Sequence, residues 1–193
     1  HVDVFADNGA ALSVLWAKSD RNLKLKEQKW DYIVLQPQSL WATSEGNFFK
    51  TQTAMRLWVN AIREVGAKPV FFMTWPRRAG SHWYRNPRYN LKNMDNMHLN
   101  IYNATSVIER QYSDLIVVPV GDYWMYAMDL DRGFNLYFDD GSHPSSEGTY
   151  FNALLFYKYL VGNSVNDLRA RPKNISKEKN DVIVSVVMTD LPR

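Results

Sequence analysis

The chain has 193 residues, of which 46% are hydrophobic and 22% charged, and its formal net charge is +3. This length and composition predict one folded domain and exclude a disordered chain. The mild, interspersed charge argues against nucleic-acid binding, the absence of cysteine excludes disulfides and thiolate metal sites, and no apolar run is long enough to span a membrane.

Short β-branched or aromatic runs alternate with longer segments of helical spacing. The run over 32–36 is almost continuously apolar, as expected of a strand buried on both faces. Strand-like segments are predicted over 2–6, 32–36, 69–74, 115–120 and 181–188, and helices over 10–18, 48–65, 94–112 and 145–160.

This alternation predicts an α/β fold of three layers, with a mostly parallel central sheet and helices on both faces. Binding sites in such sheets lie at the carboxyl ends of the strands. We expect one domain over 1–193, with a loop insertion or lid over 75–93 and an irregular tail over 163–180. Because the chain starts at His1 rather than Met, and already with a strand-like pattern, we expect its N-terminus to result from processing, cloning or truncation.

The clearest chemical signal is Asp140-Gly141-Ser142-His143-Pro144, followed by a predicted helix. An Asp three residues before a His can accept a hydrogen bond from Nδ1–H of the imidazole and leave Nε2 free to take a proton. Asp140 and His143 are therefore candidates for the orienting acid and the general base of a catalytic triad. A metal site is the weaker reading, because His1, His82 and His98 show no ligand spacing relative to His143, and no cofactor is expected.

With this block the chain resembles the SGNH (GDSL-like) hydrolases, which carry D-x-x-H-P just before their last helix. The resemblance implies a flavodoxin-like fold and a Ser-His-Asp mechanism. It also implies an oxyanion hole formed by the backbone N–H of Gly9 and the side-chain amide of Gln36, in a Gln-x-x-Ser variant of the usual Asn block. The alternatives are a turn that needs positive φ at Gly9 and a buried amide at a strand end for Gln36.

The family's nucleophile serine follows its first strand in a G-D-S or G-N-S block, and no such block precedes the segment at 2–6. Gly162-Asn163-Ser164 matches the letters but is expected to end a helix, so Ser164 would be the nucleophile only in a permuted order. We therefore expect an upstream segment of the same precursor to carry the first strand and its serine. The segment at 181–188 is expected to add an edge strand or to fill that gap.

Aromatic and basic residues near these blocks suggest a substrate site. Trp41 is expected in the acyl pocket, Trp75 and Trp83 are expected to stack on sugars, and Arg77 to bind a carboxylate or phosphate. The alternative is a solvated basic loop whose rings cover the domain surface.

The predicted function is a serine esterase for a small acyl ester, above all an O-acetyl group on a carbohydrate, or a related acyltransferase. One alternative is an inactive SGNH-fold module that binds carbohydrate or protein, and another is a flavodoxin-like domain of different function. Two Asn-x-Ser/Thr triplets, at Asn103 and Asn174, hint at a secreted or periplasmic protein.

Overall fold

Among the residues that the structure describes (1–18, 20–89, 91–130, 132–162, 165, 168 and 171–192), three strands form a parallel sheet. In this computed structural model β1 (Tyr32–Leu35), β2 (Lys68–Phe72) and β3 (Ile116–Val118) pair in that order. β2 lies between its two neighbours, so both of its edges are paired. Its apolar side chains pack into a core on each face of the sheet.

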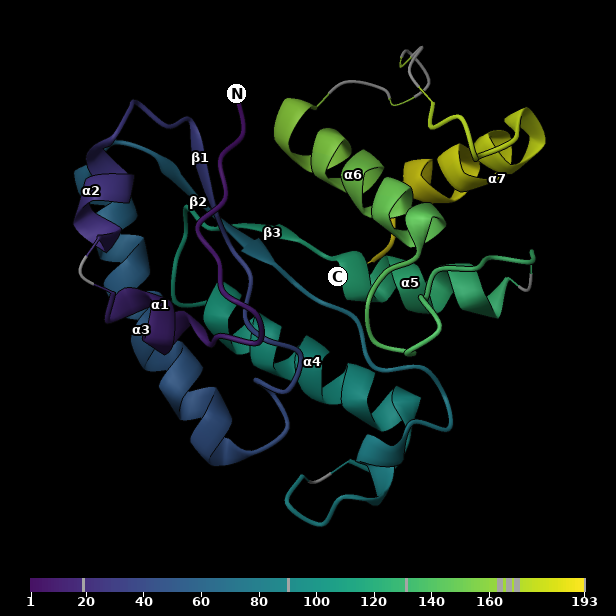
Figure 1. Ribbon diagram of the computed structural model, residues 1–193, viewed down its shortest axis with the longest axis horizontal. Coiled ribbons are helices and arrows are strands. Elements are labelled where there is room, and N and C mark those ends of the chain that lie inside the picture. The colour runs from purple at the N-terminus through teal and green to yellow at the C-terminus, as the bar shows by residue number, and fades with distance from the viewer. Residues whose placement is uncertain are drawn as a thin grey trace.

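Helices cover both faces of the sheet, as the sequence predicts (Figure 1). One face packs against α1, α3 and α4, and the other against α5, α6 and α7. None of the helices in the described ranges has the length and hydropathy needed to cross a membrane. The helices are α1 (Leu12–Trp16), α2 (Arg21–Lys26), α3 (Glu45–Glu64), α4 (Met94–Glu109), α5 (Val120–Asp129), α6 (Ser146–Val161) and α7 (Lys177–Met188), with a 3-10 turn η1 (His82–Arg85).

Alternating side chains of β2 contribute to two separate cores. Val70 belongs to the cluster on the α5–α7 side, whereas Phe71 belongs to the cluster on the α1–α4 side, and both side chains are fully buried. This alternation follows from the period of two residues in a strand. Because β1 and β2 are parallel, the loops that follow them leave the same end of the sheet.

The N-terminal segment over 2–6 does not form the expected strand. It pairs with no neighbouring strand among the described residues, and Val2 and Val4 are 88% and 74% exposed. Within the described ranges β1 pairs with β2 alone, so its other edge is unpaired, and Val34 on this strand is 43% exposed. The pattern of the segment suits a strand, but a strand also requires a partner for its backbone hydrogen bonds.

Residues 181–188 belong to helix α7, so the expected strand there is wrong. The Ser176 hydroxyl accepts a hydrogen bond from the Lys179 N–H and caps the helix. Ile183, Val186 and Val187 are buried at helical spacing. Packing of this face overrides the modest strand preference of β-branched residues. The expected irregular tail therefore ends at Ser176, and most of 163–170 lies outside the described residues.

Two further helices, α2 and α5, were not predicted. The apolar run that contains β3 continues through Pro119 directly into α5, whose first residue is Val120. Without a polar turn between strand and helix, the sequence pattern has no visible boundary there. α2 is only six residues long and has no side-chain N-cap, so it lacks the usual start signal.

Lys158 on α6 fastens the C-terminal end of the chain. Its Nζ lies 3.0 Å from the backbone carbonyls of Val187 and Thr189 and 3.0 Å from the Asp190 carboxylate. We expect Lys158→Met to lower the free energy of unfolding by about 2 kcal/mol, because the carbonyls lose a charged donor. Urea denaturation measures this, and Lys29→Met at an exposed position should change stability by less than about 0.5 kcal/mol. Equal losses in both variants would contradict the anchoring role.

Candidate active site

The segment over 138–143, called here the acid–base loop, forms a tight turn before α6. The Gly141 N–H donates to the Phe138 carbonyl at 2.9 Å, and the Phe138 N–H donates to the His143 carbonyl at 2.8 Å. Gly141 has φ +65°, a left-handed conformation that favours glycine. This turn explains the glycine in the motif and places the side chains of Asp140 and His143 together.

Asp140 and His143 form the hydrogen bond that the spacing predicts. Oδ2 of Asp140 lies 2.5 Å from Nδ1 of His143. Oδ1 accepts the backbone N–H groups of Ser142 at 2.8 Å and His143 at 2.9 Å. The bond to the His143 side chain, followed by these two backbone bonds, holds the pKa of Asp140 well below its ordinary value. A carboxylate at this position makes Nδ1 the protonated nitrogen, which leaves Nε2 with a lone pair.

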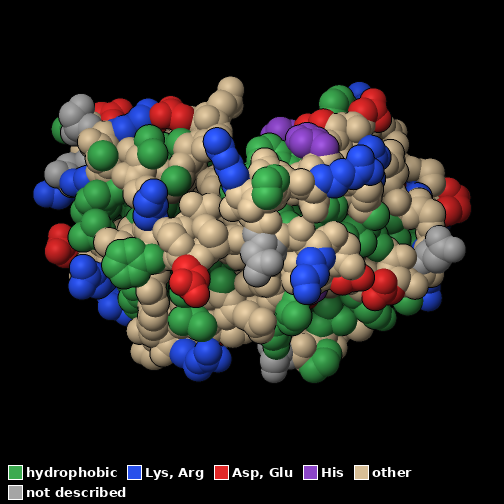
Figure 2. Space-filling model, turned by 90° about the horizontal axis from the view of Figure 1, so that it is seen from below, with side chains coloured by type: hydrophobic (Ala, Val, Ile, Leu, Met, Phe, Trp, Pro, Cys, Tyr) green, Lys and Arg blue, Asp and Glu red, His purple; other side chains and the backbone are tan. Residues whose placement is uncertain are grey.

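The imidazole is open to a reacting partner. The side chain of His143 is 78% exposed, and within the described part of the chain no side chain hydrogen-bonds its Nε2. Figure 2, seen from the lower side of Figure 1, shows a notch in the upper edge of the surface with histidine atoms beside it, and the exposure of His143 itself follows from its accessible side chain. The pair can therefore act as a base toward a group that approaches from outside the described residues.

The segment that follows β2 fixes the acid–base loop in place. The indole N–H of Trp75 donates to the Ser142 carbonyl at 3.0 Å. The backbone N–H of Arg78 donates to the Gly141 carbonyl at 2.8 Å, and its guanidinium donates to the Asp139 carbonyl at 3.1 Å. Three bonds thus tie the loop to the end of a central strand. The sequence gives no signal for this role of Arg78, because contacts between irregular loops have no sequence period.

Two of the expected substrate-binding tryptophans, Trp41 and Trp75, are buried in the core. Trp41 is 1% exposed, and its ring packs edge-on against Phe71 at a centroid distance of 5.5 Å. Trp75 is 9% exposed and stacks on Trp124 at 4.1 Å with an interplanar angle of 12°. Both rings are therefore covered by protein in this structure, and the roles of Trp41 in the acyl pocket and of Trp75 in sugar stacking stay predictions. Trp83 is half-buried and keeps a face near Arg77, whose guanidinium lies 4.8 Å from its ring centroid.

The two candidate oxyanion donors lie on different loops, Gln36 at the carboxyl end of β1 and Gly9 in the segment that precedes α1. Gly9 is exposed, with φ +67°, in a turn closed by the Ala10 N–H and the Asp7 carbonyl at 3.2 Å. Gln36 follows β1 directly and is exposed, so it is not the buried amide of the alternative reading. Neither hydrogen-bonds the Asp140–His143 pair in the described ranges, and their role in an oxyanion hole stays a prediction.

The serines near these loops have other contacts. Ser39 accepts a hydrogen bond from Arg77 at 3.0 Å, and Ser13 is exposed on α1. Neither is bonded to His143, and Ser164 lies outside the described residues. The described ranges also contain no group of three or more His, Cys, Asp and Glu side chains that could hold a metal ion.

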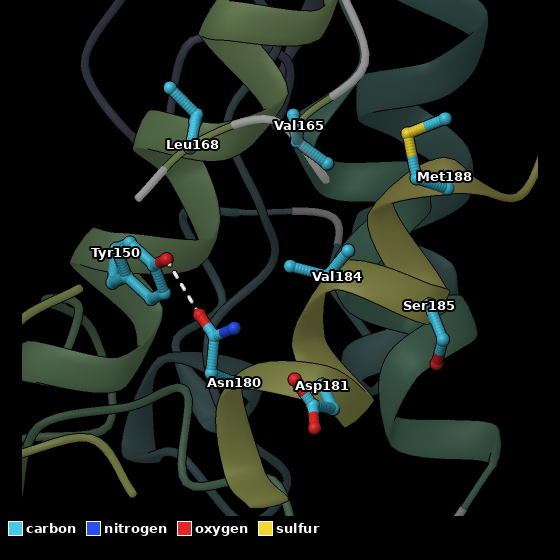
Figure 3. A pocket seen from close by; sticks show the side chains of 8 residues that line it. All are labelled: Tyr150, Val165, Leu168, Asn180, Asp181, Val184, Ser185 and Met188. Atoms are coloured by element: carbon cyan, nitrogen blue, oxygen red, sulfur yellow. Dashed lines mark hydrogen bonds between the residues drawn. The ribbon is translucent and has the colours of Figure 1, made fainter. Parts of the chain in front are cut away.

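Two cavities lie apart from the acid–base loop. The larger, of about 340 Å³, lies between α6 and α7, and Figure 3 shows the hydrogen bond of 2.7 Å from the Tyr150 hydroxyl to Asn180 at its wall. The smaller, of about 210 Å³, is lined by residues of α1 and α3. Neither lining includes Asp140, His143, Gly9 or Gln36.

No protein-family model matches the sequence, and a comparison with curated proteins gives no match. Among solved structures, the chain is similar to a DUF4886 family protein from Bacteroides uniformis, with a TM-score of 0.72 and 21% identity over 86% of this chain. The match covers 64% of that protein, so this chain spans less than two thirds of its length. The chain is also similar to a proposed SGNH hydrolase from Slackia heliotrinireducens, with a TM-score of 0.64 and 23% identity over 79% of this chain and 80% of that one. These likenesses concern the fold, and they confirm that the protein has the α/β fold of the SGNH hydrolases.

Proposed function

We propose that this protein is the acid–base part of a serine esterase that removes a small acyl group, above all O-acetyl, from a carbohydrate. The observation that carries the proposal is the 2.5 Å bond between Asp140 and Nδ1 of His143, with Nε2 left open. The SGNH-like fold supports it, since the pair lies on the loop that leads directly into α6, a helix packed on the sheet.

In the proposed mechanism, a serine Oγ attacks the acyl carbon while Nε2 of His143 takes the hydroxyl proton. The Asp140 carboxylate stabilises the resulting imidazolium and keeps its orientation. The Gly9 N–H and the Gln36 amide are the proposed donors to the oxyanion. His143 then returns the proton to the leaving sugar oxygen, and a water molecule repeats the sequence to release the acid. An alcohol in place of that water would give acyl transfer.

The open edge of β1 supports an upstream source for the serine. Among the described residues β1 pairs with β2 alone, and its apolar side chain Val34 is 43% exposed. Unpaired strand edges with exposed apolar side chains are usually covered in native proteins. We propose that an upstream segment of the same precursor pairs with this edge and brings its serine to the carboxyl end of β1, on the side of the acid–base loop.

A fluorophosphonate probe tests this proposal on the protein purified from its natural source. We expect intact mass to show one adduct and peptide mapping to place it on a serine upstream of His1. An adduct on Ser164 would instead support the permuted order. A protein that takes up no probe would overturn the esterase proposal.

The alternative is an inactive SGNH-fold module that binds carbohydrate or another protein. It is favoured by one observation, the absence of any hydroxyl bonded to Nε2 of His143 among the described residues. Such a module would bind its ligand equally well after His143 is replaced, whereas an esterase would lose turnover.

A further inference from the structure

Arg77 is a partly buried cation whose guanidinium has no acidic partner among the residues that the structure describes. Its Nη2 donates to the Ser39 hydroxyl at 3.0 Å, and the guanidinium carbon lies 4.8 Å from the Trp83 ring centroid. Its Nε is buried without a hydrogen-bond partner. No Asp or Glu of the described ranges forms an ion pair with it. Burial lowers the pKa of Arg77, and the electrostatic effects of Tyr84 and then of Asp140 partly offset this shift.

Two other sheltered cations in the described part of the chain have carboxylate partners. Lys158, with 18% of its side chain exposed, pairs with Asp190 at 3.0 Å, and Lys179, with 28% exposed, pairs with Glu147 at 3.5 Å. Removing a charge from water is costly unless an opposite charge or several hydrogen bonds compensate. Arg77 has one neutral acceptor and one ring for five N–H donors. An anion from outside the described chain would complete its coordination.

The position of Arg77 links it to the candidate active site. It follows β2 and bonds Ser39 in the loop that follows β1, so it joins the two loops that leave the carboxyl ends of these strands. Its neighbour Arg78 bonds the acid–base loop directly. The Asp140 carboxylate lies close enough to act on Arg77 electrostatically, although the two are not paired. A ligand held by Arg77 would therefore lie beside the loop that carries His143.

The surroundings of Arg77 suit a sugar ring. Trp83 and Tyr89 are half-buried, with ring centroids 5.4 Å apart and an interplanar angle of 56°. Aromatic faces provide apolar contact for sugars, while the planar guanidinium matches a carboxylate in a two-bond geometry. The neighbouring Arg85 and Arg88 are exposed to solvent and lack this shelter.

We infer that Arg77 recognises a carboxylate on the carbohydrate, so that the ligand is an acidic sugar of the uronic acid class. The inference rests on the proposed function for the ester chemistry, but the binding itself requires no serine.

Isothermal titration of the protein with methyl β-D-glucuronide and with methyl β-D-glucoside tests the inference, because the two probes differ only in the carboxylate. We expect the glucuronide to bind at least tenfold more tightly. Arg77→Met should remove this preference, and Arg77→Lys should retain part of it because a point charge replaces the planar fork.

Arg88→Met is the matched control, since it removes the same charge from an exposed position of the same loop. It should leave the preference for the glucuronide within twofold. Equal affinity for both probes, binding of neither, or an equal loss in the Arg77→Met and Arg88→Met proteins would overturn the inference. Thermal unfolding of each variant shows whether the fold is intact. A protein that binds the glucuronide but takes up no fluorophosphonate would retain this inference and lose the esterase proposal.

Discussion

Asp140→Asn is expected to lower kcat of the complete esterase for an aryl acetate by about 10,000-fold, the size of effect seen when the acid of a Ser-His-Asp triad becomes an amide. The carboxylate accepts from Nδ1 of His143 at 2.5 Å and thereby leaves the lone pair on Nε2. An Asn side chain can present its NH₂ group to Nδ1, which favours the tautomer with the proton on Nε2. That tautomer cannot take a proton from serine. Steady-state kinetics measure the loss, and the rate of fluorophosphonate labelling should fall with it.

Asp139→Asn is the matched control, because Asp139 is exposed and next to Asp140. Its contact with Arg78 is made by its backbone carbonyl, which the substitution leaves in place. The substitution should leave kcat within about twofold. Similar kcat values for the Asp139 and Asp140 variants would show that Asp140 and His143 do not act in acid–base catalysis.

The same two variants are expected to differ in how their free energy of unfolding depends on pH. The pKa of Asp140 is lowered from its ordinary value of 3.8 by its bonds to His143 and Ser142, so folding favours the carboxylate. This contribution is present above pH 3.8 and is lost as the pH falls through the lower folded-state pKa. Asp140→Asn should therefore destabilise the protein at neutral pH and progressively less in acid, whereas Asp139→Asn should show no such trend.

The acid–base loop could be predicted from the sequence because all of its determinants are local. A Gly in a left-handed turn, an Asp three residues before a His and a serine N-cap fall within six consecutive residues, 140–145. Each of these features has a fixed spacing that does not depend on the rest of the fold. The sheet strands and the long helices were also predictable, since burial on one or two faces leaves a periodic pattern.

The remaining parts depend on contacts between distant segments. Trp41 and Trp75 look like ligand-binding rings by composition, and only the packed structure shows that Phe71 and Trp124 cover them. Residues 2–6 have a strand pattern without a partner, and α7 has β-branched residues on a buried helical face. The coordination of Arg77 likewise joins loops that follow different strands. No spacing rule along the chain records such contacts.

Gly148→Ala is expected to lower the free energy of unfolding by about 3 kcal/mol, although alanine is the better helix former. A Cβ on Gly148 would lie 2.2 Å from the backbone oxygen of Leu136 and 3.1 Å from the ring of Trp124. Helix propensity favours alanine by only about 1 kcal/mol, so the clash with backbone decides the sign. The same Leu136 oxygen accepts the Ser145 N–H at 2.8 Å at the start of α6. Separation of these segments would therefore also displace the acid–base loop between them.

Gly46→Ala is the same chemical change as Gly148→Ala, but it is expected to stabilise the protein. Gly46 lies in the first turn of α3, and a Cβ built on it meets nothing within 4 Å. Its replacement should stabilise the protein by up to about 1 kcal/mol, because only helix propensity acts there. Urea denaturation of the two variants should thus move the midpoint in opposite directions. A stabilising shift in the Gly148→Ala protein as well would mean that α6 does not approach Leu136 as closely as the structure shows.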